Sequence, residues 1–247
     1  MWLACSPNAR PAVRIVLSVF VVCLLGFLGE GHTATAQVIT YQGELGTTAA
    51  STAGQPFWLR ANEYGRIDPE SANGYVRIGG TGRTDTSRVW GARAGVDVLG
   101  RWSTSETLHF SELFAQLRYR FLQLRAGRRH NTIGPVNGGA LSAGSLMQSR
   151  NATPLPMISL GTAGYVEVPY TEGFAEVKGH FAHGRFSDDR FVENVYLHRK
   201  AAYLRLGEGR VVSATMGLVH NAQWGGTSPR VGTLPQDAES YWDAVFA

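Results

Sequence analysis

The 247-residue chain has almost no cysteine. Its two cysteines, Cys5 and Cys23, both lie in residues 1–36, a segment with the features of an export signal. We expect the mature protein to begin near Gln37 and therefore to contain no thiol. This excludes a disulfide framework and a cysteine-ligated metal site from the mature chain.

Long hydrophobic runs are absent after residue 36, and no later segment approaches the roughly 18 apolar residues that a membrane-spanning helix needs. A mature protein in a membrane can then cross it only as a closed β-barrel. The one apolar run, Ile15–Leu28, follows Arg10 and Arg14 and precedes Ala34-Thr35-Ala36. This pattern predicts a secretory signal peptide cleaved after Ala36, with a retained anchor as the alternative.

Lysine is also scarce, because Lys178 and Lys200 are the only two in the chain. The net charge of +4 therefore rests on arginine, and it is too small and too scattered to indicate nucleic acid as a partner.

Motifs of common enzymes are missing too: the chain has no G-x-S-x-G elbow, phosphate-binding loop or H-E-x-x-H helix.

The main structural signal is the alternation of apolar and polar residues with a period of two. From Ala175 to Phe181, small or apolar residues alternate with Glu176, Lys178 and His180, so that an extended chain has one apolar and one charged face. A soluble sandwich with one face in water gives the same pattern. Strands are predicted at 38–45, 56–65, 74–79, 88–99, 108–119, 121–128, 157–168, 175–184, 195–206 and 210–220.

Connection lengths favour a membrane barrel over a sandwich. Short links near Arg120, Pro169–Glu172 and 207–209 alternate with long ones at 131–156 and 185–194. Outer-membrane barrels have short periplasmic turns and longer outward loops. Before residue 108, the sequence leaves open which connections are short turns and which are outward loops, because the connection at Ser103 to Glu106 fits either class. We predict an all-β fold, an antiparallel transmembrane outer-membrane β-barrel over 37–247, exported to the surface of a Gram-negative cell.

Several long segments resemble the capsule assembly protein Wzi family of outer-membrane proteins. They are SRNATPLPMISLG, FAEVKGHFAHGRFSDDRFVENVYLHRK and GLVHNAQWGG, with PFWLRANEYGRI, SELFAQLRYRFLQLRAGRRH and LSAGSLMQSR also similar. The resemblance implies a barrel of about eighteen strands whose lumen is occluded by polar side chains and loops. It implies a surface lectin that attaches or organises capsular polysaccharide. Since family members are typically longer, we expect this chain to be the N-terminal portion of such a barrel.

Two sets of polar residues are candidates for function. The inward-facing set carries both charge signs. Such residues either line an open pore or form salt bridges with one another that plug the lumen, and the clustered arginines favour the plug. Its members are Gln116, Arg118, Gln123, Arg125, Glu176, Lys178, His180, Arg199, Tyr203 and Arg205.

The second set lies in the predicted outward loops and is our candidate for polysaccharide binding. Aromatic faces pack on sugar rings, planar polar groups bond hydroxyls, and arginine attracts acidic sugars. Its members are Arg150, Asn151, Arg185, Asp188, Asp189, Arg190, Asn221, Gln223 and Trp224.

Catalysis and metal binding are disfavoured by spacing. His180 and His183 point to opposite faces of a strand, so they cannot chelate one ion together. Asp188 and Asp189 flanked by arginines favour an ion-paired loop over a protease site. We predict a monomeric, non-enzymatic barrel with no metal or cofactor, whose partners are capsular or extracellular polysaccharide and outer-membrane lipid, with no nucleic acid. A general diffusion porin and an outer-membrane protease or other hydrolase remain the alternatives.

Overall fold

The computed structural model describes residues 38–51, 54–84, 89–104, 106–131, 148–186 and 190–246. The predicted signal peptide, both cysteines, Asp188 and Asp189 lie outside the described residues. None of the helices in these ranges has the length and apolar character needed to cross a membrane.

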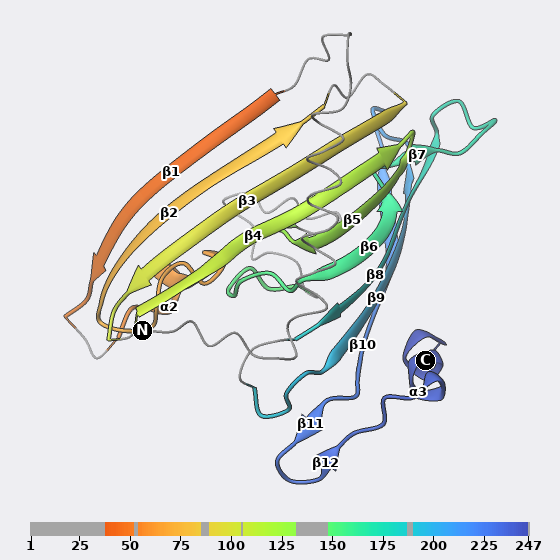
Figure 1. The fold of residues 1–247 in the computed structure, drawn as a ribbon. Helices are drawn as coiled ribbons and strands as arrows, with labels where there is room; N and C mark the ends of the chain where they lie inside the picture. The colour runs from red at the N-terminus through yellow and green to blue at the C-terminus, as the bar shows by residue number, and fades with distance from the viewer. Residues whose placement is uncertain are drawn as a thin grey trace, which may run out of the picture.

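One strongly curved antiparallel sheet contains most of the described chain (Figure 1). Its strands follow one another in sequence order from β1 to β10, with β7 paired to β8 beside this path, and β11 and β12 form a separate pair. The predicted all-β antiparallel architecture is confirmed, with a sheet that is open. The strands are β1 Val38–Ala49, β2 Ala72–Arg83, β3 Trp90–Trp102, β4 Glu106–Tyr119, β5 Leu122–Arg128, β6 Met157–Thr162, β7 Val166–Glu167, β8 Ala175–Arg185, β9 Tyr196–Leu206, β10 Ala214–Trp224, β11 Thr227–Ser228 and β12 Gly232–Thr233.

The two edges of the sheet, β1 and β10, run in the same direction, because each step along the path from β1 to β10 reverses the strand direction. Antiparallel closure of a barrel that contains this sheet therefore requires an odd number of further strands between these edges.

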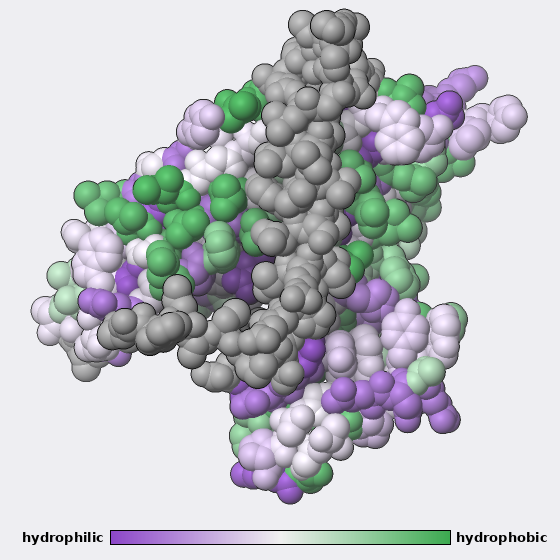
Figure 2. Space-filling view, in the orientation of Figure 1, coloured by the Kyte–Doolittle hydropathy of each residue, from purple (hydrophilic) through white to green (hydrophobic). Residues whose placement is uncertain are grey.

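Strand register separates polar from apolar side chains. Across β8 and β9, Glu176 lies opposite Arg205, whereas the next position pairs Val177 with Leu204. The predicted alternation is confirmed, with a polar concave face and an apolar convex face. Large side chains on the convex face are exposed, among them Leu218 at 81%. Figure 2 shows hydrophobic side chains in patches over the strands, while the turn beside β7 is mainly hydrophilic.

The predicted aromatic strand at 56–65 is wrong. Phe57–Arg60 form the short helix α2, and the following residues include Asn62 and Tyr64 with φ of 65° and 53°. Left-handed residues interrupt an extended chain. Pro56 has no N–H for a strand ladder, and its φ of −56° suits the start of a helix.

Two other predicted strands are displaced. The segment expected to extend through Val168 divides into β6 and β7, and the strand expected at 210–220 begins only at Ala214 and reaches Trp224. The cause at β10 is a wider turn, in which Gly207 and Gly209 adopt positive φ and Arg210 N donates to Gly207 O at 3.0 Å.

The connections divide between the two ends of the sheet. Residues 50–71, 103–105, 129–156 and 186–195 join strands at one end, which we call the loop end. Residues 84–89, 120–121, 163–174 and 207–213 join them at the other, which we call the turn end. The link at 103–105, whose class the sequence left open, belongs to the loop end although it is short.

Helix α3, Ala238–Phe246, packs on the convex side of β8 to β10 near the loop end (Figure 1). Its Tyr241 hydroxyl lies 3.5 Å from His183 Nε2, and Lys200 Nζ donates to the carbonyl of Val245 near the helix C-terminus. His183 thus faces α3, whereas His180 lies on the concave face, so the two histidines point apart as predicted.

Candidate functional site

The concave face gathers polar side chains from every long strand of the sheet. All of the residues predicted to face inward share it: Gln116, Arg118, Gln123, Arg125, Glu176, Lys178, His180, Arg199, Tyr203 and Arg205.

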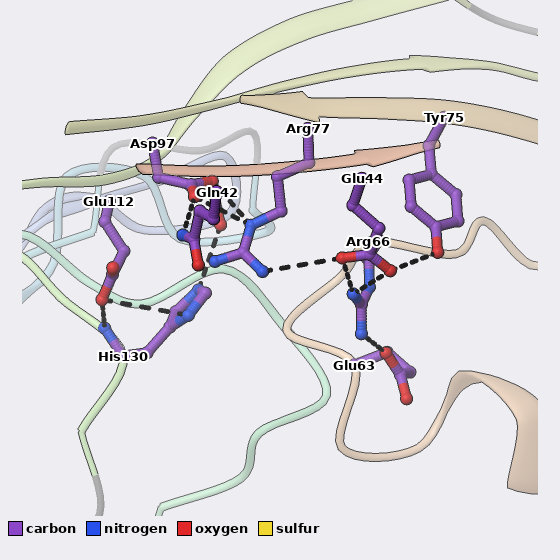
Figure 3. Close-up of polar contacts among 10 residues, drawn as sticks. Gln42, Glu44, Glu63, Arg66, Tyr75, Arg77, Asp97, Glu112 and His130 are labelled. Atoms are coloured by element: carbon purple, nitrogen blue, oxygen red, sulfur yellow. Dashed lines mark hydrogen bonds and ion pairs between the residues drawn. The ribbon is translucent and has the colours of Figure 1, made fainter. Parts of the chain in front are cut away.

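Asp97 on β3 is the centre of a network on the first strands (Figure 3). Its side chain is only 1% exposed, and each carboxylate oxygen lies 2.9 Å from Nε of Arg77. Gln42 Nε2 donates a further hydrogen bond at 2.7 Å. Gly79 leaves space for the carboxylate, because a Cβ there would lie 2.5 Å from Asp97 Oδ2. A buried charge is tolerated when it is paired and hydrogen-bonded in this way.

Glu44 on β1 extends this network to the connection between β1 and β2. It accepts hydrogen bonds from Arg66 Nη1 at 2.6 Å and from the Tyr75 hydroxyl at 2.7 Å. Arg66 also pairs with Glu63, and Arg77 Nη1 lies 3.8 Å from Glu44. Both arginines are therefore matched by carboxylates. We call the whole group the acid-paired network: Gln42, Glu44, Glu63, Arg66, Tyr75, Arg77 and Asp97.

Two loop-end connections fold over the concave face and bond to each other. The backbone N–H of Asn62 donates to Asn151 Oδ1 at 2.9 Å. Arg101 on β3 donates to the carbonyl of Gly65 at 2.8 Å and pairs with Asp68 at 3.3 Å. Residues 54–71 are therefore fastened to β3 by a charged contact and to residues 148–154 by a hydrogen bond. We call residues 54–71 and 148–154 the loop-end cover.

His130, just after β5, links this cover to β4. Its ring stacks on Tyr64 with centroids 3.9 Å apart, its backbone N–H donates to Glu112 Oε1 at 2.6 Å, and its Nε2 lies 3.0 Å from Ser111 Oγ. Burial and the nearby charge of Arg77 lower the pKa of His130 to about 4. The ring is neutral at neutral pH and forms no ion pair with Glu112, so the backbone N–H of His130 provides the hydrogen bond between the two residues.

A second group of arginines crosses the concave face without acidic partners in register. It runs from the turn end at β2 toward the loop end at β9. The residues in register across β2, β3, β4, β5, β6, β8 and β9 are Arg83, Arg93, Gln116, Arg125, Ser159, Ala182 and Arg199, and we call the arginines among them the arginine row.

Arg129 adds a further cation beside this row. Its Nη1 donates to Gln116 Oε1 at 2.9 Å, and its guanidinium lies 4.7 Å from the ring centroid of Phe114, which Arg93 also approaches at 5.9 Å. Burial, with repulsion from Arg93 and Arg125, lowers the pKa of Arg129 to about 10. The side chain still carries its charge at neutral pH, so positive charge accumulates around Phe114.

A cavity of about 360 Å³ opens beside the β2 to β4 end of the row. Nε of Arg93 is buried and has no hydrogen-bond partner among the described residues. The cavity is lined by Val38, Thr40, Gln42, Arg77, Thr81, Arg83, Arg93, Glu112 and His130.

Comparison with known proteins gives a match to a family model. The family model described as Capsule assembly protein Wzi matches residues 40–246. The chain belongs to this Wzi family. No curated protein and no solved structure matches the chain. The Wzi resemblance noted in the sequence is confirmed, and membership assigns the chain to capsule assembly. The family is not known for catalysing a reaction.

In this Wzi-family chain the predicted loop set does not form one surface. Asn151 bonds Asn62, and the carbonyl of the neighbouring Arg150 accepts from the backbone N–H of Tyr64 at 2.6 Å, so both hold the loop-end cover together. Asn221 lies within β10 on the concave face, where it accepts from Arg199 Nε at 2.8 Å.

The remaining described members of the set divide between both faces. Gln223 is on the concave side of β10, whereas Trp224 at the end of this strand stacks on Tyr196 on the convex side. Arg185 lies 5.5 Å from the same Tyr196 ring, and Arg190 lies 4.3 Å from the ring of Phe186. Trp224, Arg185 and Arg190 thus each pack on an aromatic ring.

Sequence reasoning missed the acid-paired network and part of the arginine row. One signal was present for the network: Asp97 is a lone carboxylate among small and apolar residues of β3. Arg83 and Arg93 gave no such signal. Within the described ranges, no group of three or more His, Cys, Asp or Glu side chains is placed to hold a metal ion.

Proposed function

We propose that this Wzi-family protein contributes to capsule assembly as an outer-membrane β-barrel that binds surface polysaccharide and retains the capsule without catalysing a reaction. The convex face supports membrane insertion, because Ile78, Leu108 and Leu218 on it are 65%, 76% and 81% exposed. Lipid-facing positions of a barrel carry such residues.

The observation that carries the proposal is the covered loop end. The acid-paired network and the bonds of Asn62 and Arg101 fix two long connections over the concave face. A diffusion porin needs a water-filled path, whereas a polysaccharide-binding barrel needs a fixed polar surface. The fastened cover favours the second role.

Capsule retention tests this proposal. The complete gene is deleted in its host, and cell-bound and released polysaccharide are compared with the parent strain and with a strain complemented by the wild-type gene. We expect polysaccharide to move from the cells into the medium while total synthesis is unchanged. A deletion strain that holds its polysaccharide as the parent does would overturn the role in retention.

A further inference from the structure

Among the described residues, the arginines of the row form no ion pair with a carboxylate. The positions in register with it are neutral: Gln116, Ser159 and Ala182 on the strands between the arginines. Arg83 and Arg93 lie directly opposite each other, an arrangement of like charges that destabilises a sheet. The arginine row therefore lowers the stability of the sheet, so a contribution to stability does not account for the presence of these arginines.

The surroundings of the row can receive an anionic group. The cavity of about 360 Å³ beside it falls within the range of ligand sites, and both Arg83 and Arg93 line it. Arg93 Nε is buried without a hydrogen-bond partner among the described residues. Glu112 is the one acidic residue in the cavity wall as described, and it already accepts a hydrogen bond from the His130 backbone.

We propose that the arginine row binds the anionic groups, carboxylate or phosphate, of an acidic polysaccharide. Guanidinium groups bond carboxylate and phosphate oxygens in pairs. Alternate strands are about 10 Å apart, so Arg93 and Arg125 contact separate acidic groups along one polymer. This inference rests on the proposed function and names its ligand class.

Titration calorimetry on the full-length protein in detergent tests the assignment. The probes are a galacturonate oligosaccharide, its carboxyl-reduced neutral form, and inorganic phosphate as a competitor. We expect the acidic oligosaccharide to bind and the reduced form to bind at least ten-fold more weakly. Competition by phosphate supports the shared anion chemistry and extends it to phosphate-bearing ligands, whereas a lack of competition supports carboxylated sugars.

Charge variants then locate the site. Arg93→Gln combined with Arg125→Gln is expected to weaken binding of the acidic oligosaccharide at least ten-fold, and Glu112→Gln, which keeps an acceptor for His130, is expected to strengthen it. The matched control is Arg210→Gln, an exposed arginine in the turn between β9 and β10. Circular dichroism and heat-dependent mobility on gels check that each variant is folded.

Two results would overturn the inference: a folded double variant with wild-type affinity, or equal binding of the acidic and reduced oligosaccharides. Either one leaves the proposed function intact if deletion of the gene still releases capsule. An unchanged capsule after deletion contradicts the proposed function itself, whatever the oligosaccharide titrations show.

Discussion

At the loop end of the concave face, Arg66, Arg77 and Arg101 each pair with a carboxylate. The arginine row has no acidic residue in register with it, and within the described part of the chain Arg199 bonds the neutral side chains of Asn221 and Gln148. The same residue type thus serves two purposes. Paired arginines fasten strands and connections together, whereas the arginines of the row, without a carboxylate in register, leave a positive potential that we propose an external anion satisfies.

The largest effect is expected at the most buried carboxylate of the acid-paired network. Asp97→Asn removes the charge that balances Arg77, and breaking a buried pair in this way costs about 3 kcal/mol or more. Urea unfolding followed by tryptophan fluorescence measures the change. Arg83→Gln in the row is the contrasting variant, and it is expected to cause no loss and a slight gain of stability, because it removes the like charge opposite Arg93. Equal losses for the two variants would remove the distinction between the two regions.

Packing between the two regions gives the next effect. A Cβ at Gly95 would lie 2.6 Å from Phe114 Cε1. Gly95→Val is therefore expected to displace Phe114, which Arg93 and Arg129 approach, and to cost about 1–3 kcal/mol of stability. At Gly82 a Cβ meets nothing within 4 Å, so Gly82→Val is the control. Equal stability of the two variants in urea would show that Phe114 is not held tightly.

The pH dependence of stability distinguishes the loop-end cover, which His130 contacts, from the arginine row. His130 has a pKa of about 4 in the folded chain, below its ordinary value, so the unfolded chain binds the extra proton first as the pH falls. Stability should fall between about pH 6.5 and pH 4, by at most about 1.4 kcal/mol per pH unit, and level off below. His130→Gln should remove this part of the slope in urea titrations, and an unchanged slope would contradict the assignment.

The smallest effect is expected at the partly exposed edge of the acid-paired network. Glu44→Gln leaves Arg66 paired with Glu63 alone and should cost about 0.5–1 kcal/mol, as exposed pairs do. Hydrogen exchange should rise in residues 54–71 and stay constant in β8 and β9. A uniform rise over the whole sheet would mean that Glu44 stabilises the strands and not the connection.

The sequence predicted the strands whose two faces differ clearly. β8 alternates cleanly between Glu176, Lys178 and His180 and small or apolar residues, and its face assignment is confirmed. The strand predicted at 56–65 is wrong because the prediction relied on the aromatic content of the segment. In the structure, Pro56 starts a helix and Asn62 has a positive φ, and both interrupt an extended chain. Local composition does not reveal that an aromatic segment belongs to a connection.

The arginine row could not be predicted, because it is a property of register. Arg83, Arg93 and Arg125 come into line only after every turn length is fixed, and the register shifts between Asp97 and Val98 on β3. A shift by one residue exchanges the faces of a strand. For the same reason, the sequence could not show whether the residues of the loop set share one surface. Two of them, Asn221 and Trp224, lie on opposite faces of β10.

Single-channel conductance of the full-length protein in planar lipid bilayers tests most directly whether polysaccharide meets a covered surface or an open pore. The fastened connections at 54–71 and 148–154 predict almost no conductance for the wild type. Large, steady conductance steps from the wild-type protein would contradict the covered concave face and would assign the barrel to diffusion.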